Sequence, residues 1–383
     1  MAAVRRRTPA GRGPRLSCCL HLRPPDLAVL PGGAPARGRP DPDRRRDGDR
    51  ADPTGDARDL GQASFTPRIL SAGTSRRPEA GKTEGVGEIR VGACSWTDKQ
   101  LLSSGWYPEG HRDAESRLRY YTTRFPLVEV DATYYALPST RNSVLWVERS
   151  PVGFRFDVKA FSLLTGHPTQ PSALPADLRP ALVRRRGRTE AGPELLDEVW
   201  ARFSGALEPL RQAGRLGTLL FQFPPQFAPG EPATSLLRRC RERTEGWPVA
   251  VEFRHPDWWR QERFASTFSL LEDLEMAAVA VDTVQSLPTS IPPVTPVTSA
   301  RLAVVRFHGR NRAWGSGSKE ERFRHRYTSE ELASWTPGIQ AMAGRAHEVH
   351  VLFNNCCGDA AVRAAETMRD LVGTASATGR AGG

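Results

Sequence analysis

Short runs of apolar residues recur along the chain from about residue 86, and each run ends in polar side chains. The runs are rich in Val, Leu, Ile and Phe and are bounded by Gly, Pro or polar residues, as is typical of strands buried on both faces. The predicted strands are Ile89–Trp96, Leu127–Tyr134, Phe154–Ala160, Leu216–Phe223, Val249–Arg254, Ala277–Asp282, Leu302–His308 and Val349–Asn355.

Helical spacing of apolar residues separates most of these strands. The predicted helices are Glu115–Arg124, Ser139–Ser150, Glu194–Ala213, Thr234–Thr244, Gln261–Glu275, Ser329–Gly344 and Ala360–Val372. Thr328 and Glu331 have the spacing of a capping box at the start of one helix. After Asp282 the chain is rich in Pro and Thr and has no helical period, so a loop is expected in place of the sixth helix.

Alternation of strands and helices indicates a parallel sheet, and eight such units in about 300 residues predict a closed (β/α)8 TIM-type barrel. The alternative is an open doubly wound sheet, but no G-x-G-x-x-G motif follows the first strand. We therefore expect a single α/β barrel over residues 86–375, followed by a disordered tail at 376–383.

The first 85 residues differ in composition from the rest of the chain. Arg, Pro, Gly, Ala and Asp dominate them without an apolar period, which predicts disorder. They hold 17 Lys and Arg against 10 Asp and Glu, so they carry most of the net charge of +11. No secretory signal or membrane span is predicted. We expect a solvated extension or an over-extended start, although basic residues also attract nucleic-acid phosphates.

The six cysteines suggest neither a zinc site nor a disulfide framework, because no C-x-x-C pair or Cys/His spacing is present. A reducing cytoplasm and no cofactor are therefore expected. Cys94 and Cys356 lie at strand ends, where a small apolar filler is the simplest interpretation.

Polar pairs occupy the carboxyl ends of four predicted strands. Residues two apart share a face of a strand, and the pairs are Glu129 and Asp131, Asp157 and Lys159, Glu252 and Arg254, and Arg306 and His308. The other strand ends add Ser95, Gln222, His255, Asp282, Asn354 and Asn355. Because the carboxyl ends of barrel strands meet at one mouth, where TIM-barrel active sites lie, these residues predict a single site.

Seven sequence blocks resemble the YecE-like family, catalogued as domain of unknown function 72. In order from about Arg90 to Leu371 they are VGACSW, FPLVEVDATYYALPS, GFRFDVKA, LGTLLFQFPP, VAVEFRHPDWW, VRFHGR and FNNC. The resemblance implies a TIM-type barrel and leaves residues 1–85 uncovered. It implies no activity, because the family is named for lacking one. The stretch LLTGHPT around His167 has a Gly inside what is more usually a Thr-His pair, which weakens any role that the resemblance would give to His167.

The first functional hypothesis is an acid–base or hydrolytic enzyme (a hydrolase, lyase or isomerase) with a phosphate- or carboxylate-bearing substrate. Arg254 and Arg306 would hold the anion through their bidentate donors. Glu252 and His308 would be the acid–base pair. Lys159 would lower the pKa of a neighbouring carboxylate. The further catalytic candidates are Glu129 and Asp282, and the further substrate-binding candidates are Trp96, Asp131, Tyr134, Gln222, His255, Asn354 and Asn355.

Two other hypotheses use the same end of the barrel. A metal-dependent phosphoesterase resembling endonuclease IV would place one divalent ion on Glu129, Glu252, Asp282 and His308. A nucleic-acid or ligand-binding module without chemistry would use aromatic residues after the strands as stacking platforms. These are Trp96, Trp106, Tyr107, Tyr134, Tyr135, Trp258, Trp259 and Trp314, beside the basic segment RNRAWGSGSKEERFRHR.

The competing interpretations are structural. The aromatic residues would pack over the end of the barrel, and the polar pairs would form a salt-bridge network. Within such a network Asp157 is expected to pair with Lys159, and His350 to be a satisfied core histidine. The GSGSK segment at 315–319 lacks the spacing of a phosphate loop and is expected to be a flexible lid.

Overall fold

The computed structural model describes residues 86–380, apart from 186–187 and 316–318. The predicted disordered tail at 1–85 and the last three residues lie outside the described part. None of the helices in the described part is long and apolar enough to cross a membrane.

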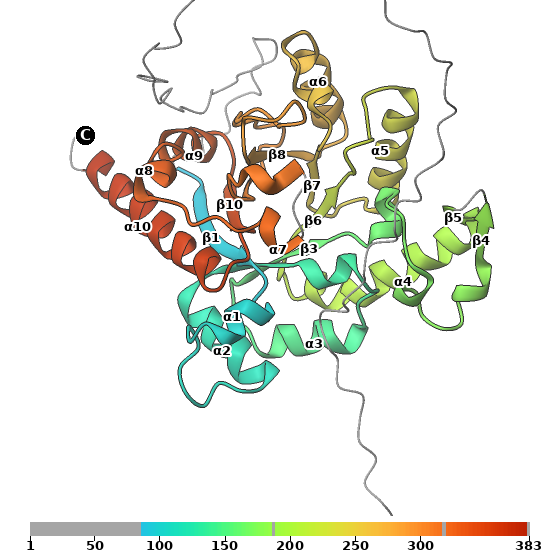
Figure 1. Cartoon of the computed structure of the whole chain (residues 1–383), viewed down its shortest axis with the longest axis horizontal. Helices are drawn as coiled ribbons and strands as arrows, with labels where there is room; N and C mark the ends of the chain where they lie inside the picture. Colours follow the sequence, from blue (N-terminus) through green and yellow to red (C-terminus); the bar gives the residue numbers. More distant parts are fainter. Residues whose placement is uncertain (1–85, 186–187, 316–318, 381–383) are drawn as a thin grey trace, which may run out of the picture. The chain divides into compact units, whose positions relative to one another are not determined.

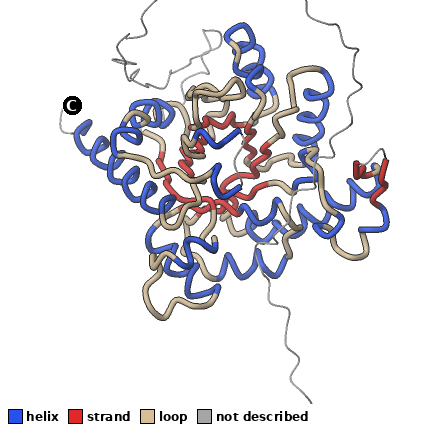
Figure 2. The backbone as a smooth tube through the Cα atoms, in the orientation of Figure 1, coloured by secondary structure: helices blue, strands red, loops and turns tan. Residues whose placement is uncertain are grey.

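Eight parallel strands close into a barrel, as predicted (Figure 1). They are β1 (Glu88–Cys94), β2 (Leu127–Val130), β3 (Arg155–Lys159), β6 (Leu216–Gln222), β7 (Val249–Glu252), β8 (Ala277–Asp282), β9 (Leu302–Phe307) and β10 (Glu348–Phe353). Each strand pairs with the next barrel strand along the chain, and β10 pairs with β1 to complete the ring. Figure 2 shows the strands at the centre and the helices around them.

The seven predicted helices are present in the predicted order, and two short helices of the described part, α1 (Lys99–Ser103) and α7 (Lys319–Arg322), were not predicted. The others are α2 (Ala114–Arg124), α3 (Thr140–Glu148), α4 (Pro193–Gln212), α5 (Glu231–Arg243), α6 (Phe264–Asp273), α8 (Ser329–Ala333), α9 (Thr336–Ala343) and α10 (Ala360–Arg380). The capping box is confirmed, because Thr328 and Glu331 each accept from the backbone N–H of the other. The loop predicted after β8 is also confirmed, since β9 is the next element.

Three local predictions need correction. The helix predicted at Ser329–Gly344 is divided into α8 and α9, because Pro337 fits only the first turn of a helix. An antiparallel pair, β4 (Leu182–Arg185) and β5 (Arg188–Ala191), was not predicted between β3 and α4. Helix α10 runs past Val372 into the stretch expected to be a tail, where the sequence holds no Pro that would end it. Part of the predicted GSGSK lid, residues 316–318, lies outside the described residues.

The register of the strands decides which side chains enter the barrel. Residues paired on neighbouring parallel strands point to the same face of the sheet. Arg306 on β9 pairs with Leu352 on β10 and with Val281 on β8, and all three face the interior. Phe307 and Phe353 face outward and stack on each other, and Trp335 covers Phe307. Large branched apolar residues usually fill barrel interiors, whereas this interior holds many charged side chains.

A glycine on β6 makes room for one buried ion pair. A Cβ atom at Gly217 would lie 2.3 Å from Oδ1 of Asp157 and 3.0 Å from Cε1 of His350. The pairing of β3 with β6 also shifts register beside Asp157. Asp157 therefore reaches across the barrel to Nδ1 of His350 at 3.0 Å, and the prediction that it pairs with Lys159 is wrong. His350 is confirmed as a satisfied core histidine, fully buried and also bonded to Glu348.

Candidate functional site

Arg306 is the centre of a buried polar network at the carboxyl half of the barrel. Its Nε and Nη2 donate to the two carboxylate oxygens of Glu129 at 2.8 and 2.6 Å. Its Nη1 donates to Glu252 and, at 3.2 Å, to Oε1 of Gln222. Burial would lower the pKa of Arg306, but Glu129 and Glu252 outweigh burial and raise it. The guanidinium therefore joins two carboxylates of the protein and has no exposed surface.

Glu252 and His308 hold a second guanidinium, that of Arg254. Glu252 forms an ion pair with Nε of Arg254, and Nη2 of Arg254 lies 2.8 Å from Nε2 of His308. Oε1 of Glu252 lies 3.2 Å from the same ring nitrogen, and Nδ2 of Asn354 lies 3.0 Å from Nδ1. Arg254 is thus fixed on two sides, and its side chain retains 10% exposure.

The electrostatics of this network argue against the predicted acid–base pair. Burial raises the pKa of Glu252, yet Arg254 and Arg306 hold it well below its usual value. Burial and Arg254 lower the pKa of His308 to about 3, so its ring is neutral near pH 7. Both side chains are fully buried. Glu252 and His308 are therefore suited to positioning Arg254. Arg306 is suited to joining Glu129 and Glu252, and not to binding a substrate anion.

A second group of side chains lies beside Arg254 at the barrel mouth. Nζ of Lys159 donates to Asp131 at 2.8 Å and lies 4.6 Å from the ring centre of Tyr134. Tyr134 also meets the ring of His167 edge-on, with the ring centres 5.2 Å apart. Burial, Lys159 and Arg254 lower the pKa of His167 to about 4. We call Asp131, Tyr134, Lys159, His167 and Arg254 the mouth cluster.

His167 is the member of the mouth cluster that sequence reasoning missed. It lies in the loop after β3, and its Nδ1 is 2.8 Å from Oγ1 of Thr165. The loops after barrel strands build TIM-barrel sites, so the position of His167 was a usable signal. Thr165 is bonded to His167 across the intervening Gly166, so the pairing persists despite that glycine.

Asp282 faces away from the mouth, so its predicted place in the site is wrong. It pairs in register with the outward-facing Phe307. Its carboxylate accepts from Arg310 Nη2 at 2.6 Å, Tyr327 Oη at 2.7 Å and Trp335 Nε1 at 2.7 Å. The four predicted metal ligands therefore do not converge. In the part of the chain that the structure describes, no group of three His, Cys, Asp or Glu side chains is arranged to hold a metal.

Replacing Asp282 with alanine is expected to lower the free energy of unfolding by about 2–4 kcal/mol, because buried donors of Trp335 and Tyr327 lose their acceptor. Urea unfolding followed by tryptophan fluorescence measures the loss. Asp282→Asn keeps one acceptor oxygen and should lose less. A change of less than about 0.5 kcal/mol for Asp282→Ala would mean that the three donors find other partners.

Three other predicted site residues make contacts outside the mouth cluster. Trp96 is 7% exposed and packs against Trp146 and Phe156, with ring centres 5.9 and 6.3 Å apart. A ring nitrogen of His255 accepts from the backbone N–H of Asp257. Nδ2 of Asn355 donates to the backbone of His325. Their predicted role in binding substrate gains no support from these contacts.

The aromatic residues that suggested stacking platforms are mostly buried. Trp106, Trp258 and Trp259 are 6, 2 and 3% exposed, which agrees with packing over the barrel end. Tyr135 is 47% exposed, and the side chain of Trp314 lies outside the described residues. A continuous stacking surface for bases is therefore not formed by the tryptophans of the described part.

Comparisons with known proteins agree with this barrel. A family model described as "Protein of unknown function DUF72" matches residues 90–381. The chain belongs to this family. It is 30% identical to the UPF0759 protein YunF of Bacillus subtilis (strain 168) over 290 residues, which are 74% of this chain and 94% of that protein. The family resemblance noted in the sequence is thereby confirmed.

Solved structures of DUF72 family proteins share the fold. One from Thermotoga maritima MSB8 is 28% identical, with a TM-score of 0.60, and the match covers 75% of this chain and 99% of that one. One from Enterococcus faecalis V583 is 26% identical, also with a TM-score of 0.60, over 75% of this chain and 98% of that one. These DUF72 relatives support the barrel and leave the chemistry to be argued from the site.

Proposed function

We propose that this DUF72 protein is an enzyme that performs acid–base or hydrolytic chemistry on a phosphate- or carboxylate-bearing substrate at the mouth cluster. One observation carries the proposal: two cations, Lys159 and Arg254, lie near enough to His167 at the carboxyl end of the barrel to lower its pKa. The ring of Tyr134 contacts both Lys159 and His167. This end of a TIM-type barrel is where catalytic groups are found.

Lys159 and Arg254 are the groups that would hold the anion. Arg254 is fixed in advance by Glu252 and His308, so binding an anion would require little reordering of its side chain. Nζ of Lys159 forms an ion pair with Asp131, whose side chain is 24% exposed. A substrate anion would displace the Asp131 carboxylate from Lys159. The buried network of Arg306, Glu129 and Glu252 thus supports the site through the ion pair of Glu252 with Arg254.

His167 is the group that would transfer a proton. Burial and the two cations keep its ring neutral, with a pKa of about 4. A neutral imidazole near pH 7 can accept a proton from a substrate hydroxyl or from water. A bound anion would offset the positive charge of Lys159 and Arg254 and raise the pKa of His167. Substrate binding would therefore make His167 a stronger base.

The test is a titration of His167 by proton NMR, with and without inorganic phosphate. Phosphate is expected to raise the pKa of His167 by at least about one unit. Lys159→Met should also raise that pKa, since it removes a cation, and should weaken phosphate binding by roughly tenfold. Lys99→Met is the matched control, because Lys99 is exposed on α1.

The resonance of His167 is assigned by its loss in His167→Asn. If phosphate leaves the titration of His167 unchanged, or if Lys159→Met and Lys99→Met behave alike, the mouth cluster is not an anion site. The same variants can be compared for hydrolysis of chromogenic phosphate and carboxylate esters. There, full turnover by His167→Asn would remove His167 from the chemistry.

We also propose a cytoplasmic location. Cys94, Cys240, Cys356 and Cys357 are free thiols in the described part of the chain. Free thiols are typical of proteins kept in a reducing compartment.

A further inference from the structure

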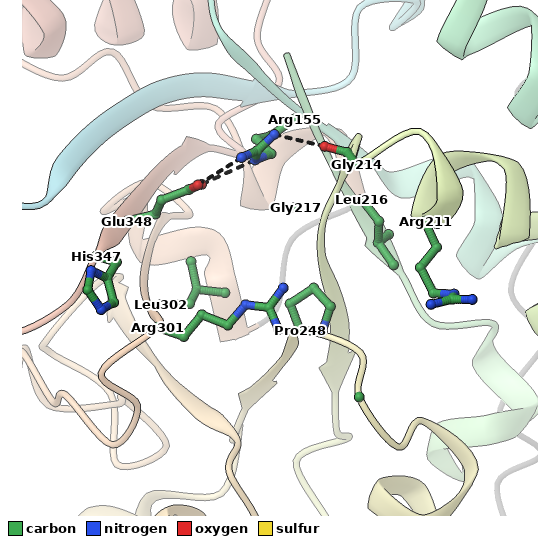
Figure 3. Close-up of a pocket in the computed structure, with 11 residues that line it drawn as sticks. Arg155, Arg211, Gly214, Leu216, Gly217, Pro248, Arg301, Leu302, His347 and Glu348 are labelled. Carbon is green, nitrogen blue, oxygen red and sulfur yellow. Dashed lines mark hydrogen bonds and ion pairs between the residues drawn. The ribbon is translucent and has the colours of Figure 1, made fainter. Parts of the chain in front are cut away.

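A cavity lies at the end of the barrel opposite the mouth cluster, where the strands begin (Figure 3). Its volume is about 460 Å³, within the range of small-molecule sites. Leu216, Pro248 and Leu302 give it an apolar wall. Its polar side chains are Arg155, Arg211, Arg301, His347 and Glu348. Neither the family assignment nor the mouth cluster accounts for it.

The single carboxylate that lines the cavity is already shared among several basic groups. Glu348 accepts from Arg155 at 2.9 Å and from Nε2 of His350 at 3.0 Å, and Nε of Arg90 lies 3.3 Å from it. These partners, with hydrogen bonds from His350 and Arg155 foremost, hold the pKa of Glu348 far below its usual value. These three partners neutralise the charge of Glu348, so it does not balance the charges of the other arginines that line the cavity.

Arg301 is the lining cation whose charge is left unbalanced. Figure 3 shows its side chain extending along the cavity toward Pro248. It is exposed, and its guanidinium has no hydrogen-bond or ion-pair partner within residues 86–380 as described. Arg211, by contrast, is paired with Glu208 at 2.5 Å.

One more arginine, Arg215, lies in the wall beside the cavity. Arg215 lies between the lining residues Gly214 and Leu216 and is 7% exposed. Its buried Nε has no hydrogen-bond partner in the described structure. Burial and the neighbouring Arg155 lower the pKa of Arg215. An anion in this region would relieve the repulsion between these arginines.

We propose that this amino-end cavity binds a small phosphate-bearing molecule, with Arg301 as its main anion contact and Leu216, Pro248 and Leu302 against its apolar part. A guanidinium presents paired donors that match phosphate oxygens. The cavity and the mouth cluster lie at opposite ends of the strands, so this site is separate from the proposed active site and does not depend on it.

The test uses inorganic pyrophosphate as the probe in isothermal titration calorimetry of the full chain. A Lys159→Met background weakens any binding at the mouth cluster. In that background Arg301→Gln is expected to weaken pyrophosphate binding by roughly tenfold or more. Arg345→Gln is the matched control, because Arg345 is exposed, lies two residues before His347 and does not line the cavity. It should change the affinity by less than about twofold.

Two results would overturn the proposal. One is the absence of pyrophosphate binding up to about 10 mM in the Lys159→Met background. The other is an equal loss of affinity in Arg301→Gln and Arg345→Gln, which would reveal only a general attraction to a basic chain. Arg301 holds no partner in the described structure, so far-ultraviolet circular dichroism should show both variants folded like the parent.

Discussion

Replacing Arg306 with methionine is expected to lower the free energy of unfolding by about 3–5 kcal/mol, because the change leaves the buried Glu129 without its ion-pair partner and Glu252 with Arg254 alone. Glu129 and Glu252 are both fully buried and both bonded to this guanidinium. Methionine has similar bulk, so loss of the ion pairs is the main effect. Urea unfolding near pH 7 measures it, with the exposed Arg238→Met as the control.

The same variant should depend on pH in a defined direction. Burial already raises the pKa of Glu129, and loss of Arg306 removes a charge that lowers the pKa of both Glu129 and Glu252, so both folded-state pKa values rise. A raised carboxyl pKa gives stability at low pH that is lost as pH rises through the folded pKa. Arg306→Met should therefore be less destabilised at pH 5 than at pH 8. A deficit below about 1 kcal/mol at both pH values would show that the network reorganises around methionine.

The second large effect concerns His350 and alkaline pH. Burial lowers the pKa of His350, but Asp157 and Glu348 outweigh burial and raise it to about 9. The unfolded value is about 6.5, so the stability from this shift is complete below that pH and is lost as pH rises through the folded pKa. On the order of 2–4 kcal/mol of unfolding free energy should be lost between these limits.

Urea unfolding at several pH values across this window tests the assignment. His350→Gln should flatten the loss of stability with rising pH, whereas the exposed His347→Gln should keep the slope of the parent. If His350→Gln retains the full slope, another group releases the proton and the pKa of His350 is not raised in the folded protein.

The barrel was predictable from the sequence because its strands are near-continuous apolar runs with polar residues gathered at their carboxyl ends, a pattern typical of a covered parallel sheet. Within such an apolar run, the alternation of side chains does not show which residues point into the barrel. In β8 the five residues before Asp282 are all Ala or Val, so alternation does not show which face Asp282 lies on. Only the pairing of Asp282 with Phe307 settles that its carboxylate points outward.

The site was predictable where partners share a strand or lie on adjacent elements. The adjacency of Glu252 and Arg254 on one face follows from strand geometry, and the two form an ion pair. The partnership of Asp157 with His350 joins residues 193 positions apart on strands that are not neighbours, so no local pattern reveals it. His167 lies in an irregular loop, where neither strand nor helical period could place its ring.

The charged barrel interior also bears on how the chain folds. Arg306 meets Glu129 across 177 residues, so the two charges cannot pair until the last strands close the ring onto the first. A half-formed barrel keeps these groups hydrated, because burying them unpaired is costly. Such an intermediate exposes polar groups where a barrel with an apolar interior would expose apolar surface, and exposed apolar surface is what drives aggregation. Ring closure and charge pairing should thus occur as one cooperative event.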